Sequence, residues 1–156
     1  MTRFSKARAL ALLTPAALLA GAYASELWGG LYPCEMCWWQ RYAHFVALGV
    51  ALLSLWAGRT PAARPLVAVA AVCIAVAGGF GAYHAGVEYG WWEGVTTCST
   101  MSAGGSHADI LADILATPLV RCDQAQWTLW GVSLAGWNAL VSLGAAGLIL
   151  WLTRKA

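Results

Sequence analysis

The chain is 156 residues long, and 60% of these residues are hydrophobic while only 10% are charged. Soluble domains average about 25% charged residues, so the composition excludes an ordinary soluble domain and indicates a single integral membrane domain over residues 1–156. The net charge of +2 gives no indication of nucleic-acid binding, and no nucleic-acid partner is expected. No phosphate-binding or dinucleotide motif is present.

Four apolar windows are long enough to cross a hydrocarbon core of roughly 30 Å, which takes about 20 helical residues. They cover about residues 10–28, 38–56, 66–87 and 127–152. The sequence therefore predicts an all-α membrane protein, a four-transmembrane-helix bundle in a lipid bilayer. Its outer loops are expected at about residues 29–37 and 88–126.

The basic residues gather on one predicted side of the membrane. Seven of the nine flank the windows on this side: Arg3, Lys6, Arg8, Arg59, Arg64, Arg154 and Lys155. The positive-inside rule makes this side cytoplasmic, so both termini are expected in the cytoplasm and the outer loops in the periplasm of a bacterial inner membrane. The first window also resembles a secretory signal peptide that ends at Ala22-Tyr23-Ala24. We favour a retained span, because the predicted four-helix packing needs this segment.

The short first outer loop leads into a Cys-x-x-Cys pair, Cys34 and Cys37. Pro33 can start the next helix, so Cys37 is expected in or near the first turn of a helix. Free N–H groups and the helix dipole favour a thiolate there. Arg41, four residues later, is expected on the same face, where it places a cation beneath the thiolate; the alternative is a side chain that snorkels to the interface. His44 is interpreted as a helix-packing residue.

The third window is rich in small residues that allow close helix packing. Cys73 lies near its middle and is interpreted as a packing residue. At the outer end, His84 and Glu88 are one turn apart. They form either a proton relay or half of a metal site, or simply a hydrogen-bonded pair at the interface.

The long second outer loop contains Cys98 and Cys122. Between them, Ser106 and Asp109 indicate a helix N-terminus, followed by an apolar stripe at Ile110, Leu111, Ile114 and Leu115. We expect a short amphipathic helix that lies on the outer leaflet or packs on the bundle. In the last window, Asn138 is interpreted as a residue that hydrogen-bonds between helices.

Three interpretations of the outer cysteines compete. A zinc site is disfavoured because Cys98 and Cys122 are not a second closely spaced pair, and no metal is expected. Two structural disulfides are possible, although Cys34 and Cys37 would close only a short loop, which stabilises little. The third interpretation is exchange, in which two redox-active pairs pass electrons between them.

These motifs together resemble the disulfide bond formation protein B (DsbB) family. The likeness rests on Cys34-x-x-Cys37 followed by Gln40-Arg41 at the start of the second span, and on a long loop with Cys98 and Cys122. It covers nearly the whole chain. The route from DsbA through DsbB to quinone keeps the bacterial periplasm oxidising.

The resemblance implies roles for individual residues. Cys98 and Cys122 would oxidise a periplasmic DsbA-like thioredoxin-fold protein, with Cys98 forming the mixed disulfide. Cys34 and Cys37 would reoxidise this loop pair and reduce a membrane quinone, either ubiquinone or menaquinone. Cys37 would contact the quinone, supported by Arg41, and His84 is assigned to the same site.

The chemistry of a quinone agrees with this assignment. Its flat apolar ring becomes basic at oxygen on reduction, so it needs aromatic surroundings, a cation and a proton source; the protein supplies position and electrostatics. Two other functions remain open. The protein could be a membrane scaffold whose disulfides only brace an outer loop, or an exporter of thiol reductant, which is disfavoured because Cys73 is the one cysteine away from the outer side.

Overall fold

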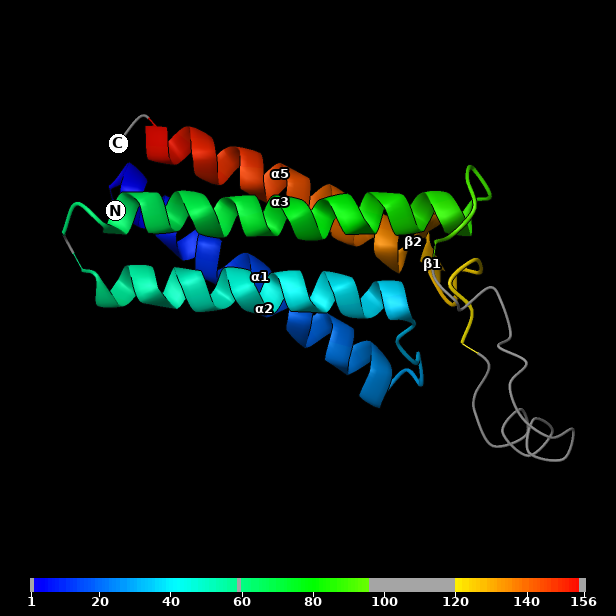
Figure 1. The fold of residues 1–156 in the computed structure, drawn as a ribbon. Coiled ribbons are helices and arrows are strands. Elements are labelled where there is room, and N and C mark those ends of the chain that lie inside the picture. The colour runs from blue at the N-terminus through cyan, green and yellow to red at the C-terminus, as the bar shows by residue number, and fades with distance from the viewer. Residues whose placement is uncertain (1, 59, 96–119, 155–156) are drawn as a thin grey trace, which may run out of the picture.

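A computed structural model of the chain describes residues 2–58, 60–95 and 120–154, and these form a helical bundle with one small hairpin (Figure 1). The helices are α1 (Arg3–Leu27), α2 (Glu35–Trp56), α3 (Ala63–Glu88) and α5 (Leu134–Arg154). The hairpin pairs β1 (Thr128–Leu129) with β2 (Val132–Ser133) in antiparallel register. The predicted all-α architecture is therefore confirmed for the described residues, except for this hairpin.

Small side chains allow the helices of the bundle to approach closely. A Cβ atom added to Gly81 of α3 would lie 2.8 Å from the carbonyl oxygen of Ala135 and 2.9 Å from Nδ2 of Asn138, both on α5. Alanines also build much of the buried core near the termini, among them Ala7 of α1 and Ala47 of α2. Close packing of this kind is typical of helices that associate in lipid.

The N-terminal end of α1, the C-terminal end of α5 and the turn between α2 and α3 lie at the same end of the bundle (Figure 1). Arg8 joins two of them, because its Nη2 donates a hydrogen bond of 2.6 Å to the carbonyl oxygen of Gly58. The connection from α1 to α2 and the hairpin lie at the opposite end. This arrangement agrees with the predicted grouping of the termini on one side.

Three helices of the described chain, α1, α3 and α5, are long and apolar enough to cross a membrane. Helix α2 falls short because Gln40, Arg41 and His44 lower the hydropathy of its outer half. Helix α2 packs against α1 and α3, and the four-span count stays a prediction.

The start of the last helix differs from the expectation. The window was predicted to begin at Trp127, whereas α5 begins at Leu134. The φ angles of Trp130 and Gly131 are 52° and 77°, and two positive φ values in succession form the tight turn of a two-residue hairpin. Hydropathy alone could not reveal this turn. The predicted amphipathic helix, with Ser106 and Asp109, lies outside the described residues.

Candidate active site

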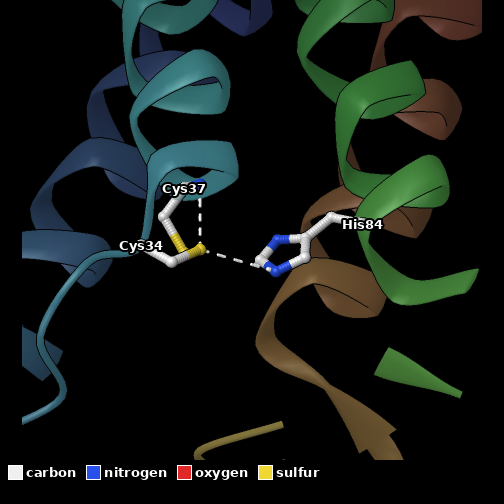
Figure 2. A group of neighbouring side chains, drawn as sticks. All are labelled: Cys34, Cys37 and His84. Carbon is white, nitrogen blue, oxygen red and sulfur yellow. Dashed lines mark hydrogen bonds between the residues drawn. The ribbon is translucent and has the colours of Figure 1, made fainter. Parts of the chain in front are cut away.

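Cys34 and Cys37 meet at the N-terminus of α2 (Figure 2). Cys34 is the N-cap residue, and its Sγ accepts a hydrogen bond of 3.3 Å from the backbone N–H of Cys37. The two sulfur atoms are 3.0 Å apart, and Cys34 is only 4% exposed. The predicted position of Cys37 in the first turn is confirmed. The pair is thus held at the positive end of a helix, within bonding reach of each other after a small movement.

The two thiols differ in acidity. A hydrogen bond with Cys37, together with burial, raises the pKa of Cys34 above its ordinary range. The hydrogen bond from Cys34 lowers the pKa of Cys37, which lies at the outer end of α2 before the predicted span, and His84 adds to this effect. The hydrogen bond between the two sulfurs therefore favours the proton on Cys34 and the negative charge on Cys37 when the pair is reduced. The lower pKa makes Cys37 the better nucleophile of the two by electrostatics.

His84 reaches this pair from α3. Its Nε2 lies 3.6 Å from Sγ of Cys34 (Figure 2). The same atom lies 3.7 Å from Oε1 of Glu88. The ligating atoms of Cys34, Cys37 and His84 all lie within 4.8 Å of one another, and two cysteines with one histidine are a donor set that zinc can use. The side chain of Glu88 is buried beside them, and its Oε2 has no hydrogen-bond partner in the described part of the chain.

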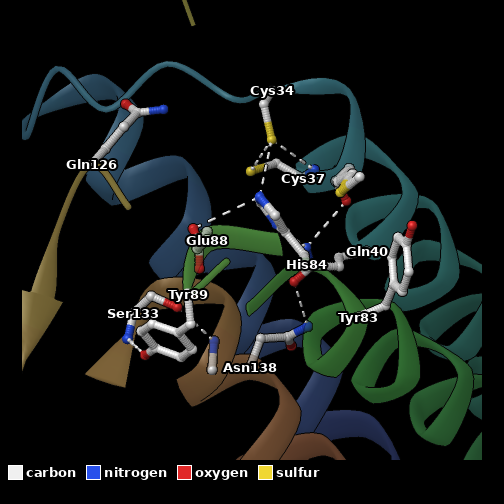
Figure 3. Close-up of polar contacts among 12 residues, drawn as sticks. Cys34, Cys37, Gln40, Tyr83, His84, Glu88, Tyr89, Gln126, Ser133 and Asn138 are labelled. Atoms are coloured by element: carbon white, nitrogen blue, oxygen red, sulfur yellow. Dashed lines mark hydrogen bonds and ion pairs between the residues drawn. The ribbon is translucent and has the colours of Figure 1, made fainter. Parts of the chain in front are cut away.

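Two amide side chains connect His84 to the interior of the bundle (Figure 3). Nε2 of Gln40 donates hydrogen bonds to the carbonyl oxygen of Met36, at 3.1 Å, and to Nδ1 of His84, at 3.0 Å. Oε1 of Gln40 accepts a hydrogen bond of 2.8 Å from Nδ2 of Asn138. Asn138 therefore joins helices, as predicted, but it also supports the site. No sequence pattern indicated that these two amides meet.

His44 lies at the inner end of this network. Its Nε2 is 2.9 Å from Oδ1 of Asn138, which also accepts a hydrogen bond of 3.0 Å from Ser142. The side chain is buried. The interpretation of His44 as a hydrogen-bonded residue between helices is confirmed.

Arg41 is buried, with 5% of its surface exposed. Its Nη1 donates a hydrogen bond of 2.7 Å to Glu26, and its Nη2 donates one of 3.2 Å to the carbonyl oxygen of Ala22. Its guanidinium also lies 4.6 Å from the ring centre of Tyr23 and 5.0 Å from that of Trp38. The side chain does not simply snorkel to the interface. Glu26 was missed as its partner, and its one signal was an acidic residue near the end of an apolar window.

One cavity connects these groups. It has a volume of about 250 Å³, and Cys34, Cys37, Arg41, His44 and His84 line it together with apolar side chains of α1. A cavity of about 150 Å³ can hold a benzene ring. The space is thus sufficient for one six-membered ring with substituents, with the sulfurs and the guanidinium on its wall.

Cys122 approaches the site from the segment before the hairpin. It is 2% exposed and packs in one buried cluster with Cys34, Met36 and Val87. Gln126 fixes the same segment to the first outer connection, because its Nε2 donates a hydrogen bond of 2.8 Å to the carbonyl oxygen of Tyr32. The structure therefore brings Cys122 to Cys34 and Cys37.

Two cysteines lie outside this group. Cys98, the other cysteine assigned to exchange, lies outside the described residues. Cys73 packs against the core cluster near the termini, as a packing residue would.

Comparisons with known proteins point to one family. The family model for disulfide bond formation protein DsbB matches residues 4–152. A disulfide bond formation protein B from Polaromonas sp. is 33% identical, over 96% of this chain and 92% of its own length. A protein of the same name from Xanthomonas oryzae pv. oryzae is 32% identical, over 91% of this chain and 84% of its own length. Another from Marinobacter nauticus is 30% identical, over 84% of this chain and 80% of its own length. No solved structure matches the chain.

Proposed function

The chain belongs to the disulfide bond formation protein B family, and from this we propose that it reoxidises a periplasmic DsbA-like dithiol protein and passes the electrons to a membrane quinone. Membership of the family makes it a membrane oxidoreductase of disulfide formation. The observation that carries the finer proposal is the meeting of three cysteines, Cys34, Cys37 and Cys122, beside one cavity.

This arrangement supports exchange between the two pairs. Reduced by the partner, the loop pair holds two thiols at Cys98 and Cys122. The thiolate of Cys122 attacks Sγ of Cys34 in the Cys34–Cys37 disulfide, and Cys37 leaves as the thiolate, which its lowered pKa favours. The thiolate of Cys98 then attacks Cys122 and releases Cys34. The loop disulfide is restored, and the two electrons now belong to the Cys34–Cys37 dithiol.

The cavity next to this dithiol fits a quinone ring. Ala17, Leu18 and Leu19 of α1 give it an apolar wall, and Cys37, Arg41 and His84 are among the polar groups that line it. A bound quinone supplies a two-electron acceptor that takes up two protons on reduction. Arg41 would hold an oxygen atom that gains negative charge, while Cys37 faces the same space as a thiolate and His84 stands beside it. The chemistry applies equally to ubiquinone and menaquinone.

We further propose that all four helices cross a bacterial inner membrane, with both termini cytoplasmic and the redox cysteines periplasmic. The support is that the chain ends and the turn between α2 and α3 share one end of the bundle (Figure 1). The basic residues concentrate at this end by sequence, as the positive-inside rule requires.

The test is quinone reduction by the purified protein, with a reduced thioredoxin-fold dithiol protein as electron source. The absorbance of the quinone is followed over time. Cys34→Ser and Cys37→Ser should each abolish turnover, whereas Cys73→Ser, outside the site, should retain it. If Cys37→Ser turns over like the parent, the assigned electron route is wrong. If the parent reduces no quinone although both pairs are intact, the scaffold function is favoured.

A further inference from the structure

The hydrogen bonds of the amide network have a fixed direction, because each amide also contacts a backbone carbonyl oxygen that can only accept. The carbonyl oxygen of Met36 identifies the NH₂ group of Gln40, and this group also faces Nδ1 of His84. In the same way, the carbonyl oxygen of Ala77 accepts a hydrogen bond of 3.1 Å from Nδ2 of Asn138, which then donates to Oε1 of Gln40 as well. Neither amide can turn over without losing these partners.

The direction of the network determines the tautomer of His84. Because Gln40 donates to Nδ1, this nitrogen must carry a lone pair, and the proton of the neutral imidazole must reside on Nε2. Nε2 is the atom that faces Cys34 and Glu88, at 3.6 Å and 3.7 Å (Figure 3). Both neighbours can accept a hydrogen from it. His84 thus presents an N–H group to the sulfurs.

We propose that Gln40 and Asn138 are positioning residues that keep the Nε2 proton on His84, and that they thereby prevent the Cys34–Cys37–His84 cluster from capturing a metal ion. The cluster otherwise has the composition and spacing of a site for zinc or a similar soft divalent ion. Such capture would block a dithiol whose proposed role is exchange.

A metal ion needs the opposite tautomer. Its ligand would be the lone pair of Nε2, and the proton would move to Nδ1, where a ligating histidine normally donates to a carboxylate or carbonyl oxygen. To accept this proton, Gln40 would have to turn its oxygen toward His84. It would then lose the hydrogen bond to Met36 and bring its NH₂ group against the NH₂ group of Asn138. The network therefore opposes metal binding by its geometry.

A carboxylate at position 40 should remove this opposition. In Gln40→Glu, one oxygen can accept from Nδ1–H of His84 while the other still accepts from Asn138. Partners of this kind change metal affinity by about 10–100-fold, so we expect Gln40→Glu to bind a divalent metal about 10–100-fold more tightly than the parent. Ser142→Ala is the matched control, because it removes one hydrogen bond to Asn138 without reversing any amide.

The experiment is a Co²⁺ titration of the reduced, detergent-solubilised full-length protein, followed by thiolate-to-cobalt charge-transfer absorption. Cys73, Cys98 and Cys122 are replaced by alanine in every variant, so that Cys34 and Cys37 are the remaining thiols. The gain in Co²⁺ affinity that Gln40→Glu produces should disappear when His84→Ala is added. Equal affinity in the parent and Gln40→Glu, or a gain that persists without His84, would overturn the proposal.

A second measurement needs no substitution in the network. The ¹⁵N spectrum of His84 in the reduced parent should show the proton on Nε2 and a lone pair on Nδ1. A proton on Nδ1 of the neutral ring would overturn the proposal even if Gln40→Glu fails to fold. Neither measurement uses a quinone or a partner protein, so their outcome is independent of the proposed oxidase activity.

Discussion

The ion pair between Arg41 and Glu26 predicts a strong energetic coupling between α2 and the end of α1. Their nearest charged atoms are 2.7 Å apart, and the two side chains are 6% and 26% exposed. A hydrogen bond between charged groups contributes about 1.5–3 kcal/mol when water is excluded. Since a quarter of Glu26 is exposed, screening reduces the expected coupling to about 1–2 kcal/mol.

A double-mutant cycle measures this coupling. The free energy of unfolding in a denaturing detergent is compared for the parent, Glu26→Gln, Arg41→Met and the double variant. The Arg121–Asp123 pair, whose side chains are 47% and 33% exposed, serves as a control, and its coupling should be smaller because solvent screens it more. Additive effects of Glu26→Gln and Arg41→Met would refute the reasoning, because the ion pair would then contribute nothing to the bundle.

The same variants separate a structural role of Arg41 from a role in quinone binding. Loss of the cation should raise the quinone KM of Arg41→Met by about 10–100-fold, the equivalent of roughly 1.4–2.8 kcal/mol. The quinone KM of Arg41→Lys should lie between those of the parent and Arg41→Met, because lysine keeps the positive charge but not the planar guanidinium. In Glu26→Gln the guanidinium of Arg41 keeps its hydrogen bond to Ala22 and its contacts with the rings of Tyr23 and Trp38. A smaller rise of the quinone KM is therefore expected for this variant. An unchanged KM in folded Arg41→Met would restrict Arg41 to a structural role.

Three further outcomes are expected. Cys122→Ala should trap a mixed disulfide between Cys98 and the dithiol partner, visible as a band shift on a non-reducing gel that disappears with dithiothreitol. Trapping through another cysteine would contradict the assignment. Because the pKa of Cys37 is lowered and that of Cys34 is raised, iodoacetamide should modify Cys37 of the reduced protein well below pH 8 and leave Cys34 unmodified. An ordinary thiol is mostly protonated at that pH. Mass spectrometry of the peptides at several pH values shows which cysteine reacts, and equal pH profiles for the two cysteines would contradict the lowered pKa of Cys37. Gly81→Ala should destabilise the bundle by about 1–3 kcal/mol, because the added Cβ would press on the backbone of α5. Gly79→Ala should not destabilise it, because no atom lies within 4 Å of the Cβ added there. Equal unfolding free energies of the two variants would contradict the close approach of α3 and α5.

The features that the sequence predicted best depend on short stretches of chain. Pro33 predicted a helix start just before Cys37, and α2 begins at Glu35, since a proline acts within one turn. The position of Cys37 in that first turn followed directly. The clustering of the chain ends followed from hydropathy and charge, which act over whole helices.

The features that it missed depend on how separate helices are rotated against each other. Glu26 and Arg41 belong to different helices, and no spacing rule connects them. Gln40 and Asn138 are 98 positions apart in the chain, so each was interpreted alone or not at all. The hairpin before α5 was missed for another reason, because a positive φ at Trp130 is unusual for a large side chain.

The cap of α2 has a consequence for how the protein can be observed. The acceptor for the free amide of Cys37, in the first turn of this helix, is not the usual hydroxyl or carboxylate but Sγ of Cys34, and sulfur accepts hydrogen bonds weakly. Its electron density changes with each bond that Cys34 makes or breaks. The N–H of Cys37 should therefore exchange with solvent, and resonate, differently in each redox form, so that a single backbone amide reports the oxidation state of the protein without any label on a cysteine.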